Sequence, residues 1–165
     1  MAIAPSDIVF RLSGGASNTA PGASLGGVKS STTAAPAAIF DTVDGAESAT
    51  GDVEYRCVYV HNLHATLTMQ NAVAWLFANT PNASTDIAVG VGTSAVNGTE
   101  QTVANEGAAP AGVTFSAAAT QGAGVALGSI PPGQHRAVWL RRTVTAGAPA
   151  SSDGCTLRVT CDTAA

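Results

Sequence analysis

The sequence has few charged and few aromatic side chains. Asp, Glu, Lys and Arg make up 11% of its 165 residues, against about 25% in an average soluble domain. Phe, Trp and Tyr together make up 5%. A hydrophobic core must therefore be built mainly from Val, Leu and Ile. The length fits one domain of ordinary size.

Positive charge is especially scarce. Lys29 is the only lysine, and 7 basic residues stand against 11 acidic ones, which gives a formal net charge of -4. A nucleic-acid-binding protein normally presents a basic face that neutralises phosphates. We therefore expect no nucleic-acid partner.

Long apolar runs are missing as well. No stretch approaches the roughly 20 apolar residues of a membrane span. Residues Met1–Pro5 have neither the positive charge nor the apolar run of a signal peptide. We expect a protein that is made in a cytoplasm and has no membrane partner.

Cysteine is limited to Cys57, Cys155 and Cys161, an odd number without metal-type spacing. On one strand, Cys155 and Cys161 would lie about 20 Å apart, too far for a disulfide, which needs Cα atoms within about 7 Å. Cys57 could face either of them across a sheet. Three reduced, buried thiols are the alternative that we favour.

Glycine and proline are plentiful, with 18 and 8 residues, and they separate short segments of alternating polarity. The clearest is 135–144, where Trp139 and Arg141 share one face and Leu140 and Arg142 share the other. Residues 53–60 alternate in the same way and predict a half-buried strand. Further strands are expected at 7–12, 66–69, 72–77, 86–92, 101–103, 125–127 and 155–161.

Two turn-related signals accompany these strands. Gly90 and Gly92 share one face of a predicted strand, which indicates a bulge or a close backbone approach. Asn97-Gly98 is typical of a tight turn, from which residues 101–103 could return. Many short strands without a long helix predict an all-β fold, a single β-sandwich of jelly-roll or immunoglobulin-like connection.

The sequence divides into residues 1–50, with a strand and an extended arm, and residues 51–165, the sandwich. The arm, Ser13–Pro36, is rich in Gly, Ala and Ser and has few large side chains. It cannot bury enough surface to fold alone. It is either a flexible linker or an arm that a neighbouring surface must order.

Catalytic chemistry is sparse. His61 and His64 could bind a metal together with Asp41 or Asp44, but without a third spaced ligand we favour ordinary hydrogen-bonded histidines. There is no Gly-x-Ser-x-Gly elbow, dinucleotide-binding loop or acid pair. We expect no catalytic residue, no metal, no cofactor and no small-molecule substrate.

Four segments together carry a resemblance to a known group of proteins. They are Leu12–Asn18 (LSGGASN), Ala23–Gly27 (ASLGG), Glu54–Asn62 (EYRCVYVHN) and Ile130–Arg142 (IPPGQHRAVWLRR). In this pattern the chain resembles small virion structural proteins of tailed bacteriophages, from about residue 10 to the C-terminus. The motifs are signatures of strands and turns and not of catalysis.

The resemblance implies a non-enzymatic building block. Within that class we expect a capsid cement or decoration protein on the virion surface, made in the cytoplasm of the host bacterium. Its partners would be the major capsid protein, whose contacts it would cover, and neighbouring copies of itself. Residues expected at the assembly interface are Ser13, Gly14, Gly15, Asn18, Leu25, Lys29, Arg141 and Arg142.

Two alternatives remain open. A tail or neck component would use the same sandwich and arm. A carbohydrate-binding module on the virion surface would need exposed aromatic side chains, whereas Trp75 and Trp139 both lie in apolar strands and are expected in the core.

Overall fold

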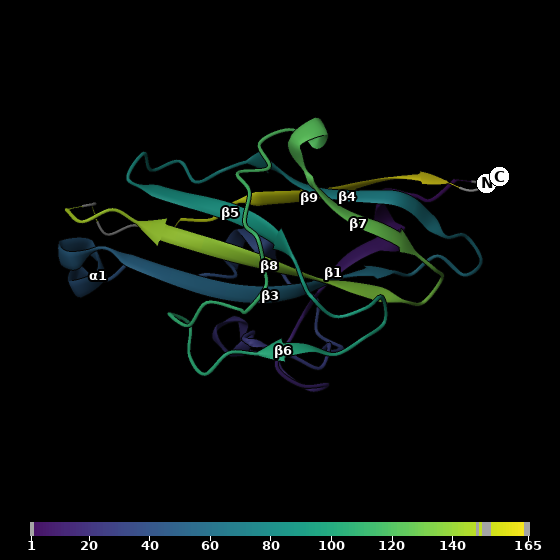
Figure 1. Ribbon diagram of the computed structural model, residues 1–165, viewed down its shortest axis with the longest axis horizontal. Helices are drawn as coiled ribbons and strands as arrows, with labels where there is room; N and C mark the ends of the chain where they lie inside the picture. Colours follow the sequence, from purple (N-terminus) through teal and green to yellow (C-terminus); the bar gives the residue numbers. More distant parts are fainter. Residues whose placement is uncertain (1, 148, 150–152, 164–165) are drawn as a thin grey trace.

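The computed structural model describes residues 2–147, 149 and 153–163, and it confirms the all-β fold. Two antiparallel sheets pack face to face as a β-sandwich (Figure 1). The four-stranded sheet has the order β1 (Ile8–Leu12), β3 (Asp52–Asn62), β8 (His135–Val144) and β5 (Thr85–Val91). The three-stranded sheet has the order β7 (Val125–Ile130), β4 (Met69–Ala78) and β9 (Thr156–Thr163).

The remaining elements are short. Strands β2 (Gly26–Gly27) and β6 (Glu100–Thr102) pair with each other. The single α-helix in the described part of the chain is α1 (Gly45–Thr50), where the Asp44 side chain accepts hydrogen bonds from the backbone N–H groups of Ala46 and Glu47. The 3-10 helices are η1 (Pro5–Asp7), η2 (Pro21–Ala23), η3 (Pro36–Ala38) and η4 (Gln121–Ala123).

The main core lies between the two sheets. Val138 and Leu140 of β8 alternate into it, as predicted, and pack in one cluster with Val58 of β3 and Leu76 of β4. These branched side chains suit the pleated, half-enclosed surface of a strand. Burial of apolar area, at about 25 cal/mol per Å², stabilises this packing.

The opposite face of the four-stranded sheet is covered too, which differs from the half-buried strand predicted for residues 53–60. Cys57, Tyr59 and Trp139 are fully buried there. They form a second cluster with side chains from two loop segments, including Leu25 and Phe115. Strand β3 is therefore buried on both faces over much of its length.

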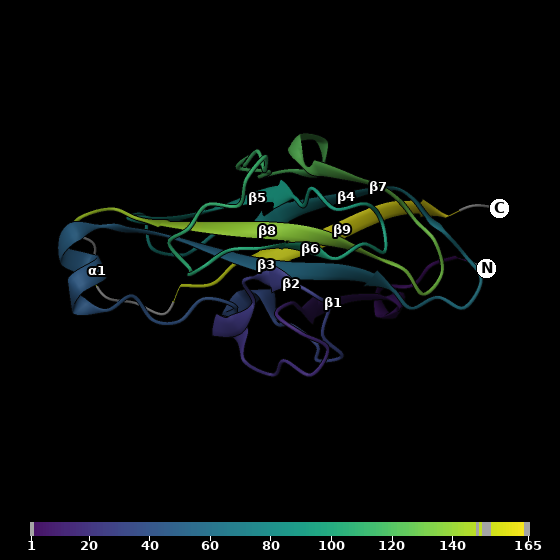
Figure 2. The same ribbon diagram turned by 60° about the horizontal axis from the view of Figure 1, so that its bottom comes forward.

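The Gly/Ala/Ser-rich segment provides much of this third layer. Ser30 N–H donates to the Leu12 carbonyl at 2.8 Å, and Leu12 N–H donates to the Thr32 carbonyl at 3.1 Å, so residues 30–34 line the edge of β1. Figure 2 shows this N-terminal segment (residues 13–36, which include β2) in purple beside β1 and β3. The surface beside this segment belongs to the same chain, and whether the segment also contacts a neighbouring molecule stays a prediction.

Two local expectations also differ from the structure. Residues 66–77, expected as two strands, contribute a single strand, β4, with a register shift where Asn71 takes a φ of 48°. The turn at Asn97-Gly98 is present, with Gly98 N–H bonded to the Ala95 carbonyl. The strand after it, however, pairs with β2 in the N-terminal segment.

The close approach predicted at Gly90 is confirmed. A Cβ at this position would lie 2.5 Å from Val113 Cγ1 and 2.9 Å from the Thr114 carbonyl oxygen. The missing side chain lets the segment around Val113 pack directly on β5. Val89 and Ser116 exchange backbone hydrogen bonds of 2.8 and 2.9 Å there.

Candidate functional site

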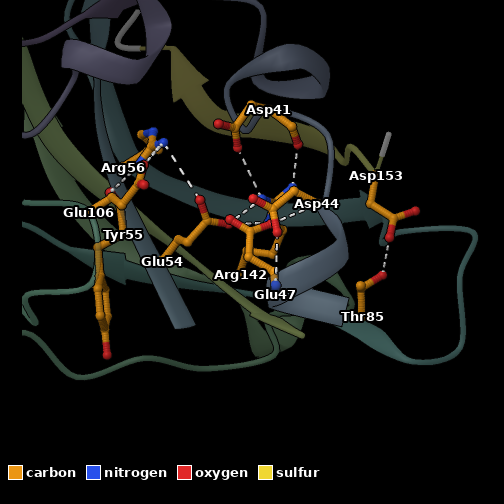
Figure 3. Close-up of polar contacts among 10 residues, drawn as sticks. All are labelled: Asp41, Asp44, Glu47, Glu54, Tyr55, Arg56, Thr85, Glu106, Arg142 and Asp153. Atoms are coloured by element: carbon orange, nitrogen blue, oxygen red, sulfur yellow. Dashed lines mark hydrogen bonds and ion pairs between the residues drawn. The ribbon is translucent and has the colours of Figure 1, made fainter. Parts of the chain in front are cut away.

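A buried ionic cluster connects β3 and β8 (Figure 3). Glu54 and Arg56 lie two residues apart on β3, so they share a face, and Arg142 of β8 is the register partner of Glu54. The side chains of Glu54 and Arg142 are 0% exposed, and that of Arg56 is 1% exposed. Charged side chains are almost never buried to this extent unless they are paired.

Each of the three buried charges has partners. Arg142 donates from Nε and from a terminal nitrogen to the Glu54 carboxylate, and it also donates to the Asp41 carbonyl at 2.5 Å and to Asp41 Oδ1 at 3.1 Å. Arg56 donates to the Glu106 carboxylate and lies 3.7 Å from Glu54 Oε1. The cluster thereby ties the loops at Asp41 and Glu106 to the four-stranded sheet.

The surroundings of Glu54 combine apolar burial with positive charge. Burial raises the pKa of Glu54 to about 7, and the guanidiniums of Arg142 and Arg56 oppose this rise. The Phe40 ring lies 5.1 Å from Arg142 Cζ and 5.7 Å from Arg56 Cζ, within cation–π range of both. The network is not fully satisfied, because Glu54 Oε1 and Arg56 Nε are buried without a hydrogen-bond partner among the described residues.

Carboxylates from this cluster do not make a convincing metal site. Oxygens of Asp41, Glu54 and Glu106 lie within 4.8 Å of one another, but each carboxylate is already paired with Arg56 or Arg142. A second group, Glu47, Asp52 and Glu54, shares the same buried Glu54. The guanidiniums occupy the positions from which a cation would be bound.

The two histidines considered as metal ligands make ordinary hydrogen bonds instead. His61 Nε2 lies 3.0 Å from the Gly133 carbonyl oxygen. His64 Nδ1 accepts from the backbone N–H groups of Thr66 and Leu67. Among the described residues, neither histidine belongs to a metal-compatible group of three, and the hydrogen-bonded interpretation holds.

Two of the residues expected at an assembly interface lie inside the molecule. The Ser13 hydroxyl is buried, donates to the Cys57 carbonyl at 2.8 Å and accepts from Gly26 N–H at 3.1 Å. Arg142 is enclosed by the ionic cluster. Both side chains are enclosed within this chain, and whether either residue contributes to an assembly interface stays a prediction.

The other expected interface residues are exposed or half-buried: Gly14, Gly15, Asn18, Leu25, Lys29 and Arg141. Asn18 Nδ2 donates to the Ser13 carbonyl at 2.6 Å and holds the start of the N-terminal segment. Arg141 Cζ lies 5.3 Å from the Phe115 ring, on the face of β8 opposite to Arg142. Whether these six residues contact a partner stays a prediction.

An aromatic face lies on the outer side of the three-stranded sheet. Along β4, Ala74 and Leu76 are buried, whereas Trp75 is half-buried and Phe77 is 54% exposed. The two rings are 5.8 Å apart, and Arg158 of β9 lies over the Phe77 ring with Cζ 3.3 Å from its centroid. Trp139 is in the core as expected, but Trp75 borders this outer face.

Arg158 differs from the buried arginines in its partners. Within the described parts of the chain, its guanidinium lies over the rings of Trp75 and Phe77 and takes part in no ion pair. Its N–H groups therefore remain available to an acceptor from another molecule. We refer to Trp75, Phe77 and Arg158 as the aromatic face.

All three cysteines are free thiols. Cys57 is buried under the loop layer, Cys155 is buried beside Pro36, and Cys161 is half-buried in β9. Burial raises the pKa of Cys155 to about 12 and also raises the pKa of Cys161. The structure thus has three free thiols, as expected, but only Cys57 and Cys155 are buried, whereas Cys161 was also expected to be.

No protein-family model matches the chain, and no curated protein or solved structure is significantly similar to it. No helix among the described residues is long and apolar enough to cross a bilayer.

Proposed function

We propose that this protein is a structural component of a bacteriophage virion, a capsid cement or decoration protein that binds over contacts between subunits of the major capsid protein. The observation that carries the proposal is the aromatic face. Trp and Arg are enriched among the residues that dominate binding energy at protein interfaces. Here an exposed ring and an arginine without an ion pair stand on adjacent strands of a sheet.

The rigidity of the molecule supports the same role. The ionic cluster ties the loop at Asp41 to β8, and backbone hydrogen bonds tie residues 30–34 to β1. A preformed surface loses little conformational entropy on binding. On a shell, many modest contacts act together through multivalency. The sequence resemblance to phage virion proteins points to the same class.

Co-sedimentation with isolated phage heads and, separately, with isolated tails tests the proposal. We expect saturable binding to mature heads, in numbers that follow the capsid lattice. Phe77→Ser should weaken this binding at least tenfold, because it removes the most exposed ring of the aromatic face. Leu63→Ser is the matched control, since Leu63 is a similarly exposed apolar residue, 43% accessible, that lies outside the aromatic face.

Binding to tails alone would overturn the capsid assignment and support the alternative of a tail or neck component. Binding to neither particle would overturn both. Equal binding by Phe77→Ser and the unmodified protein would show that the aromatic face is not the attachment surface.

A virion-surface carbohydrate-binding module is the second candidate, and the position of Trp75 and Phe77 favours it. Aromatic rings on the outer face of a sheet can stack against sugar rings. Titration with host surface polysaccharide should then quench tryptophan fluorescence, and Trp75→Phe should abolish the change, because Trp139 is inaccessible. Unchanged fluorescence at saturating polysaccharide would exclude this candidate.

A further inference from the structure

Edge strands present backbone groups that can pair with another chain, and proteins usually protect them. The edge of β1 is lined by residues 30–34. The edge of β5 is covered by Ser116, paired with Val89, and by the Asn79 side chain, which bonds both backbone groups of Ile87. Strand β7 pairs irregularly, contains Gly128 at a φ of 76° and is followed by two prolines.

Strand β9 is less protected: among the described residues, η3 lies against its start and Ile3 N–H donates to the Thr163 hydroxyl at 3.2 Å, but no segment pairs with the backbone of its outer edge. In the described part of the chain, its backbone hydrogen bonds run only to β4 on one side. It contains no proline and no lysine. Its inward-facing Val159 and Cys161 pack against the core cluster but are only half-buried, and among the described residues β9 is the last strand of its sheet.

The outward-facing side chains of β9 form a self-complementary pattern. Arg158 and Asp162 are equally spaced on the two sides of Thr160. If β9 pairs antiparallel with its own copy about a twofold axis at Thr160, residue 158 of one chain lies opposite residue 162 of the other. Each Arg158, which lies over the Phe77 ring of its own chain, is then opposite Asp162 of the partner subunit. Within one chain the Asp162 carboxylate also accepts a hydrogen bond from Asn71 Nδ2 at 2.9 Å, which leaves its other oxygen for the partner's arginine. Shifting the axis to Val159 or Cys161 would lose both charge pairs.

We infer that the protein forms a twofold-symmetric dimer through β9, with a second copy of this chain as the partner. The axis passes through Thr160, and the two three-stranded sheets join into one continuous sheet across the interface. Val159 on each side would lie beside Cys161 of the partner subunit. The dimer can be tested independently of the virion proposal, because it is measured on purified protein alone.

A site-specific crosslink tests the register. In a Cys161→Ser background, Thr160→Cys should form a disulfide-linked dimer under mild oxidation, because directly opposite Cβ atoms lie about 4.5–5.5 Å apart in an antiparallel pair, close to disulfide spacing. Thr156→Cys in the same background is the matched control. Its copies would lie about 27 Å apart, eight positions along the strand.

Charge exchange tests the complementarity. Arg158→Asp and Asp162→Arg, each alone, should weaken dimerisation roughly 2- to 30-fold, because two opposite-charge pairs become like-charge pairs. The double exchange should restore the dissociation constant to within about threefold of the original. Sedimentation equilibrium gives the constants, and thermal melting of dilute protein confirms that each variant is folded.

Efficient crosslinking through residue 160 but not 156, together with rescue by the double exchange, supports the β9 dimer. A protein that stays monomeric at millimolar concentration would overturn it. Equal crosslinking at both positions, or two single exchanges that leave the dissociation constant unchanged, would also overturn it. Co-sedimentation of Phe77→Ser with heads is a separate result, so failure of the dimer leaves the virion proposal standing.

Discussion

Glu54 carries the one negative charge in the fully buried part of the ionic cluster and lies between two guanidiniums. Replacing it with alanine would leave Arg56 and Arg142 buried without their shared counter-ion. We expect Glu54→Ala to lower the free energy of unfolding by about 3–5 kcal/mol, the range for breaking a buried ion pair. Urea denaturation measures the loss.

Glu106→Ala is the matched control for this prediction. Glu106 also pairs with Arg56 but is 45% exposed, so water can solvate the arginine after the change. We expect a loss of no more than about 1 kcal/mol. Equal losses of unfolding free energy in both variants would show that the destabilisation does not depend on how deeply the removed carboxylate is buried.

The alternation of residues 53–60 carries a signal for this cluster. Glu54 and Arg56 alternate in step with Val58 and Val60, so a core-facing Val58 implies core-facing charges. Arg142 shares the face of residues 135–144 that carries Leu140, so the same reasoning applies to it. Its pairing with Glu54 depends on the register between β3 and β8, which joins residues 88 positions apart and cannot be deduced from either strand alone.

His135 provides a prediction about pH. Burial and the nearby charge of Lys29, with a contribution from His61, lower the pKa of His135 to about 4, and its ring lies edge-on to Tyr59 at 4.8 Å. Between pH 6.5 and 4 the unfolded chain therefore binds more protons at this histidine than the folded chain does. Its contribution to stability falls as the pH decreases through this interval.

The comparison of His135→Asn with the unmodified protein isolates that contribution. The difference in unfolding free energy between the two should shift in favour of the variant as the pH falls from 7.5 to 4.5. Glu54 changes the unfolding free energy in the opposite direction, because its raised pKa favours the folded state at lower pH. The difference between the variant and the unmodified protein is therefore informative, whereas the pH dependence of either protein alone is not. A difference that does not change with pH would contradict the prediction.

At the scale of elements, the alternation of side chains along the sequence predicts the bounds of a strand well where that strand lies between two layers of side chains. Strand β8 spans His135–Val144, the same residues that were predicted. Alternation failed for β4, where an irregular residue at Asn71 interrupts the periodicity within one strand. It also could not place residues 13–36, because hydrogen bonds to backbone groups hold this segment, some of them from the Ser13 and Asn18 side chains, and such bonds follow no periodic pattern in the sequence.

Substitution of Gly26 tests whether the pairing of β2 with β6 holds residues 13–36 in place. Gly26 has a φ of 92°, and a Cβ there would overlap the Gln101 carbonyl oxygen of β6. Gly26→Ala should destabilise the protein by about 1–3 kcal/mol and speed protease cleavage within residues 13–36. Gly22→Ala is the control, since a Cβ at Gly22 meets no atom within 4 Å. Equal cleavage of both variants would show that β2 does not anchor the segment.

At the scale of the whole molecule, the first 50 residues and the remainder form one structure. Strand β1 pairs with β3, Ile39 and Phe40 pack in the main core, and the N-terminal segment covers Cys57 and Tyr59. This packing leaves the aromatic face on one side of the sandwich. The predicted boundary at residue 50 rests on amino-acid composition, and composition carries no information about contacts between residues that are far apart in the sequence.

A fragment of residues 51–165 should therefore fail to fold by itself. Removing residues 1–50 would expose the outer face of β3, take Phe40 from beneath the two arginines and leave Arg142 without Asp41. We expect red-shifted Trp139 fluorescence and no cooperative thermal transition, whereas a control that lacks only residues 1–4 should melt cooperatively. A fragment with native emission and a sharp melt would show that residues 51–165 are an autonomous domain after all.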